Sequence, residues 1–293
     1  MNSPELSLPR QSVMVLVPWA ALLVFGTIMV SSASVAMPGN FIEKQFINLA
    51  ISAFLVTLIL TVPLSLWARF YWLGWLVSLV LVLAVLVPGL GHEAKGATRW
   101  IRLGGFNLQA VEVAKFGLMI YLAGYLSRYH ERLQNQPNRI FLPLGMVFVI
   151  CALVVAEPDL GSASVVFAAT LSVLFMAGAK LRFVMLMVVG GGLLFAAMIW
   201  LEPFRMRRMI AFTDPWAVPY DTGYQLVQAL IAFGRGELTG LGLGEGIQKL
   251  SYLPEAHNDF IFAVVAEELG SVGAIALIAL YCFFVFVVLN VAK

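Results

Sequence analysis

The residues with the clearest chemical potential lie in one acidic segment near the end of the chain. Residues 254–270, Pro-Glu-Ala-His-Asn-Asp-Phe-Ile-Phe-Ala-Val-Val-Ala-Glu-Glu-Leu-Gly, place four carboxylates at the start of an apolar run: Glu255, Asp259, Glu267 and Glu268. A carboxylate beside hydrocarbon is costly to ionise, so a membrane segment that keeps one usually faces a wet cavity where it takes part in chemistry or proton transfer. Asp259 is therefore the first candidate for a catalytic group.

Asp259 also has a purely structural interpretation. At the start of a helix over 259–290, its carboxylate would be stabilised by the helix dipole and by free backbone N–H groups. On an ideal helix Glu267 lies about 80° around from Asp259, whereas Glu268 lies nearly opposite. We therefore expect Glu267 to be the neighbour of a cavity, and Glu268 to need a partner of its own or the far membrane boundary.

A second charged pair lies earlier in the chain. Glu112 and Lys115 are three residues apart, the spacing at which opposite charges meet on one face of a helix. The pair can simply reduce the cost of two buried charges. A lysine beside a cavity can also offer a cation to a phosphate, and both interpretations stay open at this point.

Further polar residues lie at the ends of apolar runs. The sequence Glu-Pro-Asp-Leu-Gly-Ser at 157–162 separates two such runs with almost no loop, because proline stops one helix and Asp159 can cap the next. The two acids can also bind a cation or hold a cavity wall. Other cations and an aromatic residue suit a phosphate or a lipid headgroup, with interfacial anchoring as the simpler interpretation: Arg99, Trp100, Arg102, Arg205, Arg207 and Arg208.

The elements that position these residues are membrane helices. Of 293 residues, 61% are hydrophobic and only 12% are charged, about half the charged share of a soluble domain. A net charge of +2, spread over many loops, gives no argument for nucleic acid as a partner. Cys151 and Cys282 both fall inside apolar runs, without metal-ligand spacing. The sequence therefore predicts an all-α polytopic membrane protein.

We expect one transmembrane domain over 1–293, with eight helices and no soluble domain. Each apolar run approaches the length of about 20 residues that a spanning helix needs. The first run lacks the pattern of a cleaved signal peptide, so we expect it to be retained. The predicted spans are 13–36, 46–64, 70–88, 107–127, 140–157, 161–178, 182–200 and 259–290.

The loops indicate an orientation. Basic residues gather on one side, which predicts a cytoplasmic N-terminus: Arg10, Arg69, Arg128, Arg132, Arg139, Lys180, Arg182 and Lys293. The long loop 201–258 then lies outside the cytoplasm and leads directly to Asp259. Within it, 233–246 has glycine at nearly every second position but lacks the Gly-Lys-Ser/Thr of a P-loop. We expect a re-entrant or surface-hugging loop that lines a cavity.

Several motifs resemble the SEDS family (shape, elongation, division and sporulation). Residues 254–262 and 266–270 resemble its signature, and four more segments match in the family's order: Gly-Ala-Thr-Arg-Trp-Ile at 96–101, Glu-Pro-Asp-Leu-Gly-Ser at 157–162, Gly-Tyr-Gln at 223–225 and Phe-Gly-Arg-Gly-Glu at 233–237. Three further segments resemble the division-specific branch of Gram-negative bacteria, at 177–180, 203–208 and 248–254. The elongation-specific branch is the nearest competitor.

The resemblance implies a GT-C-type helical bundle that polymerises lipid II, the undecaprenyl-pyrophosphate-linked disaccharide-peptide. It implies that Asp259 is the general base on the acceptor sugar hydroxyl, with undecaprenyl pyrophosphate as the leaving group. Expected substrate-binding residues are Lys115, Glu112, Arg99, Trp100, Arg205, Arg207, Arg208, Asp159 and Glu267. A divalent cation, Mg²⁺ or Mn²⁺, is compatible with this chemistry, but no residue pattern assigns its ligands.

The same resemblance implies partners and a place in the cell. It implies a multi-pass protein of the bacterial inner membrane, at the division septum, that acts with a class B penicillin-binding protein and other division proteins among membrane lipids. The family has ten membrane helices, so the last two are expected to be absent here, and activity of this chain alone is doubtful. A lipid II flippase or transporter is the main alternative, although no internal repeat of the kind common in transporters is evident.

Overall fold

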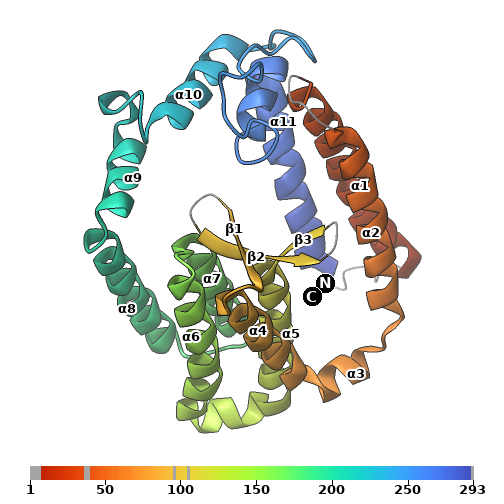
Figure 1. Cartoon of the computed structure of the whole chain (residues 1–293). Helices are drawn as coiled ribbons and strands as arrows, with labels where there is room; N and C mark the ends of the chain where they lie inside the picture. Colours follow the sequence, from red (N-terminus) through yellow and green to blue (C-terminus); the bar gives the residue numbers. More distant parts are fainter. Residues whose placement is uncertain (1–7, 36–39, 95–96, 104–105, 292–293) are drawn as a thin grey trace. The chain divides into compact units, whose positions relative to one another are not determined.

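The computed structural model describes residues 8–35, 40–94, 97–103 and 106–291, and it is mostly helical (Figure 1). The chain divides into two compact units. Unit 1 comprises Met1–Val56 and Glu202–Lys293, and unit 2 comprises Thr57–Leu201. Each unit is described by itself below.

A helix lies at the position of each of the eight predicted spans. These helices are α1 (Leu8–Ala33), α2 (Phe41–Thr61), α4 (Tyr71–Leu86), α5 (Ala110–Asn135), α6 (Phe141–Ala156), α7 (Leu160–Met176), α8 (Leu181–Trp200) and α11 (Ile261–Val291). Within the described residues, α1, α2, α5, α8 and α11 contain stretches long and apolar enough to cross a membrane. The helices α4, α6 and α7 are apolar but only 16 or 17 residues long, so their crossing stays a prediction.

Several shorter elements lie between the main helices, in segments that we expected to be loops, except that residues 107–109 were expected to begin a helix. They are α3 (Leu64–Arg69), α9 (Pro203–Thr213), α10 (Tyr224–Gly236), two short 3₁₀ helices at Pro137–Ile140 and Pro215–Ala217, and the strands β1 (Gly91–Ala94), β2 (Ala97–Leu103) and β3 (Phe106–Gln109). The strands form one antiparallel sheet in chain order. Its register places Ile101 opposite Leu108 and Trp100 opposite Gln109. This small sheet lies in the segment between α4 and α5, and the predicted all-α membrane fold is confirmed. The helix α5 begins at Ala110, later than the predicted start at 107, because residues 106–109 belong to β3.

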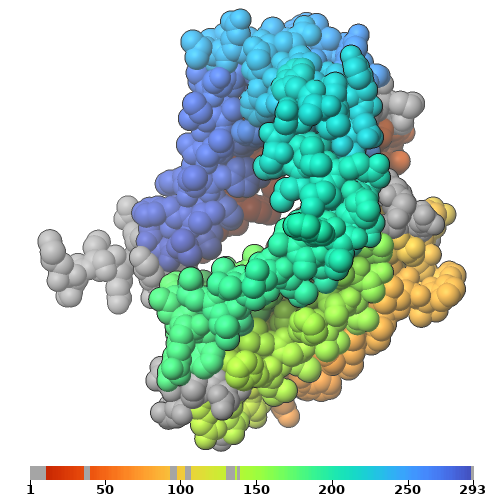
Figure 2. Space-filling model, turned by 90° about the vertical axis from the view of Figure 1, so that its left-hand side faces the viewer, coloured from red at the N-terminus to blue at the C-terminus, as the bar shows by residue number. Residues whose placement is uncertain are grey.

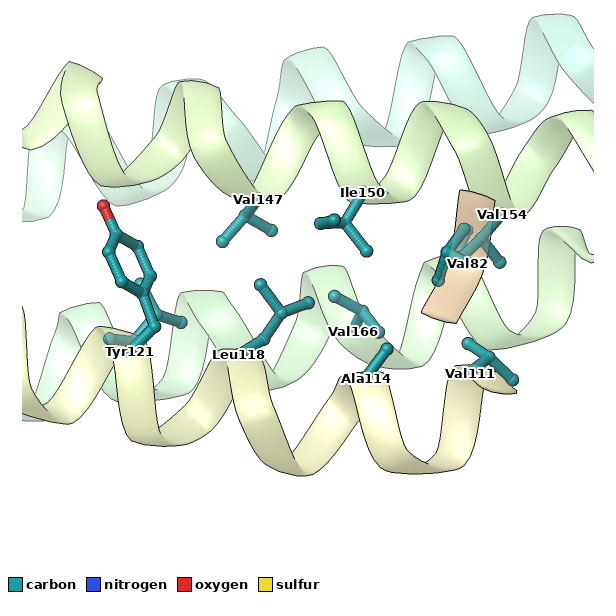
Figure 3. Packing of buried hydrophobic residues seen from close by; sticks show 11 residues of the cluster. Val82, Val111, Ala114, Leu118, Tyr121, Val147, Ile150, Val154 and Val166 are labelled. Atoms are coloured by element: carbon teal, nitrogen blue, oxygen red, sulfur yellow. The ribbon is translucent and has the colours of Figure 1, made fainter. Parts of the chain in front are cut away.

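The core of unit 2 lies between α4, α5, α6 and α7. Figure 3 shows buried side chains of these helices pointing towards one another, with Leu118 of α5 facing Val147 and Ile150 of α6. Leu118 and Ile150 are fully buried. Because such a core is packed at crystal-like density, each helix is fixed against its neighbours.

Two glycines let α4 and α5 approach closely in unit 2. A Cβ added to Gly117 would lie 2.5 Å from the carbonyl oxygen of Gly74, and one added to Gly74 would lie 2.4 Å from the carbonyl oxygen of Gly117. Small residues at such crossings are the usual means of close helix packing in membranes. Beside them, the Ser78 hydroxyl donates to the carbonyl oxygens of Gly74 and Ala114.

In unit 1, α1 and α10 both pack on α11. The space-filling view shows α10 and the segment after it covering the first turns of α11 (Figure 2). The shared apolar core contains Met29 of α1, Ala232 of α10 and Val264 of α11, together with Leu253 and Ala256 from the segment that precedes α11. The acidic segment of interest is thus built into a packed core.

We predict that Gly117→Ala lowers the melting temperature of the detergent-solubilised protein. The added methyl group would force α4 and α5 apart, at a cost of about 1–3 kcal/mol. Gly145→Ala on α6 is the matched control, because a Cβ there meets nothing within 4 Å and alanine favours the helix. Equal melting temperatures for the two variants would contradict the close crossing.

Candidate functional site

Asp259 lies in a turn, not in a helix. The helix α11 begins at Ile261, two residues later than predicted, so the angular argument that related Asp259 to Glu267 does not apply. The backbone N–H groups of Asn258 and Phe260 both donate to the carbonyl oxygen of Glu255. Asn and Asp favour such turns because their side chains compete with helical hydrogen bonds.

The carboxylate of Asp259 is exposed. Within the part of the chain that the structure describes, no hydrogen bond or ion pair engages it. This environment differs from that of a capping carboxylate, which accepts a backbone N–H of its own helix. The side chain is thus available to an incoming polar group.

The segment around Asp259 is nevertheless held firmly by its neighbours. Leu253 and Ala256 are buried in the core of unit 1. The Tyr224 hydroxyl donates to the carbonyl oxygen of Tyr252 at 2.9 Å. The ring of His257 packs edge-on against Phe41, with 5.0 Å between centroids. An exposed acid therefore sits on a fixed support.

The helix α11 is broken at Gly270, which has φ 67° and ψ −171°. The carbonyl groups of Glu267 and Glu268 accept hydrogen bonds from the N–H groups of Leu241 and Gly242, each at 3.0 Å. Beyond the break, Ser271 and Val272 donate to the carbonyl groups at positions 237 and 238, at 3.0 and 3.1 Å. The glycine-rich loop thus supplies the hydrogen bonds that the helix gives up, which a backbone away from water requires.

Glycine is required where this loop meets α11. Gly240 has φ +79°, and a Cβ there would lie 2.1 Å from the carbonyl oxygen of Glu268. A Cβ at Gly236 would lie 1.8 Å from the carbonyl oxygen of Ala266. The glycine-rich run 233–246, whose first residues belong to α10, therefore packs closely against α11, and its predicted role in lining a cavity stays a prediction.

The carboxylate of Glu268 lies in a fully buried polar cluster. It pairs with the Lys249 ammonium at 2.5 Å, and it accepts hydrogen bonds from the Ser32 hydroxyl at 2.7 Å and from the Gly244 N–H at 3.0 Å. Lys249 uses its other two donors on the Ser32 oxygen, at 2.8 Å, and the Gly244 carbonyl, at 2.7 Å. The partner that we expected Glu268 to need is thus Lys249.

Glu267 is also fully buried, and it binds the next part of the same loop. Its carboxylate accepts hydrogen bonds from the backbone N–H groups of Ile247 and Gln248, each at 3.1 Å. The Arg235 guanidinium lies 3.6 Å away. The predicted contact of Glu267 with substrate stays a prediction, and in this structure the side chain has no exposed surface.

In unit 2, Glu112 and Lys115 form the predicted pair on α5. The Lys115 ammonium lies 2.7 Å from the Glu112 carboxylate, and the two side chains are 27% and 56% exposed. An exposed pair of this kind contributes little to stability, typically less than about 1 kcal/mol. Both charges remain accessible on the surface of their unit.

A second cluster of unit 2 surrounds the turn between α6 and α7. Asp159 caps α7 by accepting the backbone N–H of Ser162, as predicted. Arg99 on β2 donates to the Pro158 carbonyl at 2.7 Å and approaches the Asp159 carboxylate at 3.7 Å. Glu157 is buried, and neither of its carboxylate oxygens has a hydrogen-bond partner among the described residues. Burial, reinforced by the nearby Asp159 charge and opposed by Arg99, raises the pKa of Glu157 from 4.5 to about 7.

The remaining predicted residues divide between the units. Trp100 lies on β2 of unit 2, half-buried. Arg205, Arg207 and Arg208 lie on α9 of unit 1, where Arg207 and Arg208 are exposed and the Arg208 guanidinium stacks on the Phe204 ring. Among the described residues, no three His, Cys, Asp or Glu side chains converge as a metal site.

Sequence reasoning missed three members of the buried cluster in unit 1: Ser32, Arg235 and Lys249. The available signal was a shortage of partners, because two adjacent glutamates in an apolar helix need compensating charges. Ser32 was one of several small polar residues in the first apolar run, with Thr27, Ser31 and Ser34, and Lys249 followed the glycine-rich loop by three residues. Nothing in the spacing of these residues connects positions 32, 249 and 268.

Comparison with known proteins gives the family. The family model of the cell cycle proteins FtsW, RodA and SpoVE matches residues 12–293. The chain belongs to the FtsW/RodA/SpoVE family. It is 44% identical over 275 residues to a probable peptidoglycan glycosyltransferase FtsW of Saccharophagus degradans, covering 91% of this chain and 71% of the relative. An FtsW of Nitrosococcus halophilus is 42% identical and is covered to 76%, with 98% of this chain aligned.

Solved structures also show similarity to this family. A peptidoglycan synthase complex, studied for how it coordinates polymerization and crosslinking, matches 92% of this chain and 74% of the other chain with a TM-score of 0.73 at 25% identity. The rod shape determining protein RodA of Thermus thermophilus matches 93% and 72% with a TM-score of 0.65, also at 25% identity. With its apolar helices, this member of the FtsW/RodA/SpoVE family is a multi-pass membrane protein.

We predict that Glu157→Gln stabilises the protein at pH 8 more than at pH 5. Because the pKa of Glu157 is raised on folding, the contribution of this group to stability is fully present below about pH 4.5 and is lost as the pH rises through about 7. The neutral variant avoids this loss, which reaches about 2–3 kcal/mol above pH 7. Melting temperatures at the two pH values measure the effect. Glu202→Gln, at an exposed site, should show no such difference, and an equal effect of Glu157→Gln at both pH values would contradict the raised pKa.

Proposed function

We propose that this chain is a peptidoglycan glycosyltransferase that polymerises lipid II into glycan strands during septal wall synthesis, with Asp259 as the general base. Family membership supports the reaction class, since the similar curated proteins are named probable peptidoglycan glycosyltransferases. The observation that carries the assignment of the base is the environment of Asp259. It is an exposed carboxylate without a described partner, on a rigid support at the start of a membrane helix.

The reaction needs a base for the acceptor sugar hydroxyl and cations for the departing diphosphate. The acceptor sugar hydroxyl loses a proton as it attacks the anomeric carbon, and a carboxylate within hydrogen-bond reach can take that proton. The bond from the anomeric carbon to undecaprenyl pyrophosphate then breaks, and negative charge develops on the departing diphosphate. Cations placed where this charge develops stabilise the transition state.

Lys115 is the first of the proposed diphosphate ligands. An ammonium has three donors, and among the described contacts one of them reaches Glu112. Glu112 thereby orients Lys115 without burying it. We assign Arg205, Arg207 and Arg208 on α9 to binding either the diphosphate or lipid headgroups. Arg99 and Asp159 bind each other at the turn between α6 and α7, so we assign them to the support of a substrate wall, with Trp100 beside them on β2.

The proposal extends to partners and location. A related chain is part of a complex that couples polymerization with crosslinking. We assign the same coupling to this chain, with a class B penicillin-binding protein as partner, in the inner membrane at the division septum. The FtsW identity of the similar curated proteins favours division over elongation. The long segment from Glu202 to Phe260 then lies on the periplasmic side, where lipid II is consumed.

We predict that Asp259→Asn strongly slows polymerisation of purified lipid II by the intact protein in complex with its partner. The amide cannot accept the proton, so the rate should fall by about 10²–10⁴-fold, while lipid II binding and the melting temperature stay unchanged. The matched control is Asp221→Asn, at another exposed aspartate of unit 1. Continued polymerisation by Asp259→Asn would refute the base assignment. If Asp259→Asn retained polymerisation but lost translocation of lipid II in proteoliposomes, the result would favour a transporter.

We predict that Lys115→Met lowers kcat/KM for lipid II by at least about tenfold, because one charge-assisted contact to the diphosphate is lost. Since the ion pair is exposed, the melting temperature should change little. Lys115→Arg, which keeps the charge, should retain more activity. Lys180→Met, at an exposed lysine that precedes α8, is the control. Unchanged kcat/KM in Lys115→Met would remove this residue from the site.

A further inference from the structure

We propose that the buried cluster of Ser32, Arg235, Lys249, Glu267 and Glu268 is a positioning device that fixes the location of Asp259. This inference rests on the proposed function, because it concerns the base of that reaction. None of the five residues needs to touch substrate. They act through the backbone segment that carries Asp259.

The cluster joins the two ends of the chain segment that carries Asp259. An ion pair joins Lys249 and Glu268. The chain leaves the cluster after position 249, passes through the turn at Asp259, and returns to the cluster along α11 at position 268. Asp259 lies within this closed loop. Because Lys249 is fixed on one side and the first turns of α11 on the other, the freedom of residues 250–260 is limited at both ends.

A buried ion pair attaches the loop to α11. Lys249 and Glu268 are 2% and 0% exposed, and every donor of the ammonium is used. The Glu267 carboxylate also accepts hydrogen bonds from two backbone N–H groups of the same loop. Removing one member of a buried pair leaves an uncompensated charge in a low dielectric, which strongly disfavours the packed loop. The buried cluster therefore favours the packed position of the loop on α11 over its release.

The loop and α11 are in close contact at Gly246. A Cβ at Gly246 would lie 2.9 Å from the Glu268 carboxylate and 3.0 Å from the Glu267 carboxylate. Both glutamates thus contact the loop where it has no side chain. Because Asp259 itself has no described partner, its location depends on this support and on the burial of Leu253 and Ala256. Small displacements of a reacting group cost large factors in rate.

The test separates positioning from stability with two variants. Lys249→Met leaves Glu268 charged and unpaired, so both the melting temperature and kcat should fall. The double variant Lys249→Met/Glu268→Gln removes the unpaired charge and should regain most of the melting temperature. Its kcat should stay lower than that of the unmodified protein by about 10–100-fold with KM nearly unchanged, because the link between loop and helix is missing. The assay is lipid II polymerisation by the intact protein in complex with its partner.

Two controls complete the design. Gly246→Ala should lower kcat, whereas Gly234→Ala on α10, where a Cβ meets nothing within 4 Å, should not. Val287→Ala, at a buried site of α11 far along the chain from the cluster, should lower the melting temperature while keeping kcat. Amide hydrogen exchange of residues 240–260 should rise in the double variant but not in Val287→Ala.

Each outcome decides one point. If kcat of the double variant returns together with the melting temperature, the cluster serves stability alone and the positioning role is wrong. The same conclusion follows if exchange of residues 240–260 does not change in that variant. If Asp259→Asn retains polymerisation, the proposed function fails at the base, and this result is independent of the cluster variants.

Discussion

The structure of unit 1 depends on one constraint: the backbone groups at the break in α11 and the buried carboxylates beside it must all find hydrogen-bond or charge partners. At Gly270 the helix gives up its own hydrogen bonds, and at the preceding positions it buries two adjacent carboxylates. Neither feature is stable in an apolar environment without partners. The loop 237–249 supplies both sets of partners, four backbone hydrogen bonds and the charges or N–H groups that bind Glu267 and Glu268. The glycine-rich sequence, the buried lysine and the fixed turn around Asp259 follow from this requirement.

The acids of the chain consequently serve different purposes. Glu267 and Glu268 are buried and fully bound, Asp159 is used as a helix cap, and Asp259 is exposed without a described partner. A carboxylate that holds backbone N–H groups is committed to structure, whereas an available carboxylate can accept a proton from substrate. Sorting the acids by their partners therefore indicates the base more directly than their proximity in the sequence, where the three acids at 259, 267 and 268 look alike.

Local rules were sufficient for part of the fold and of the site. Long apolar runs located the eight main helices, the three-residue spacing predicted the Glu112–Lys115 pair, and the sequence after Pro158 predicted the cap at Asp159. Each depends on residues a few positions apart. The break at Gly270, the sheet over residues 91–109 and the meeting of Ser32 with Lys249 depend on segments far apart or on pairing between short strands. Hydropathy and helical spacing carry no information about such contacts, and the predicted helix start at 259 failed because the turn hydrogen bonds at Glu255 outweighed the helical pattern.

The most direct test of this account is a structure of the intact protein with lipid II bound at the acceptor position. The quantity to measure is the distance from the Asp259 carboxylate oxygens to the acceptor sugar hydroxyl. We predict direct hydrogen-bond contact, about 2.6–3.2 Å, or contact through one water, with the loop 237–249 in place on α11. A hydroxyl bound to a different base, with Asp259 turned away from the sugar, would contradict the account.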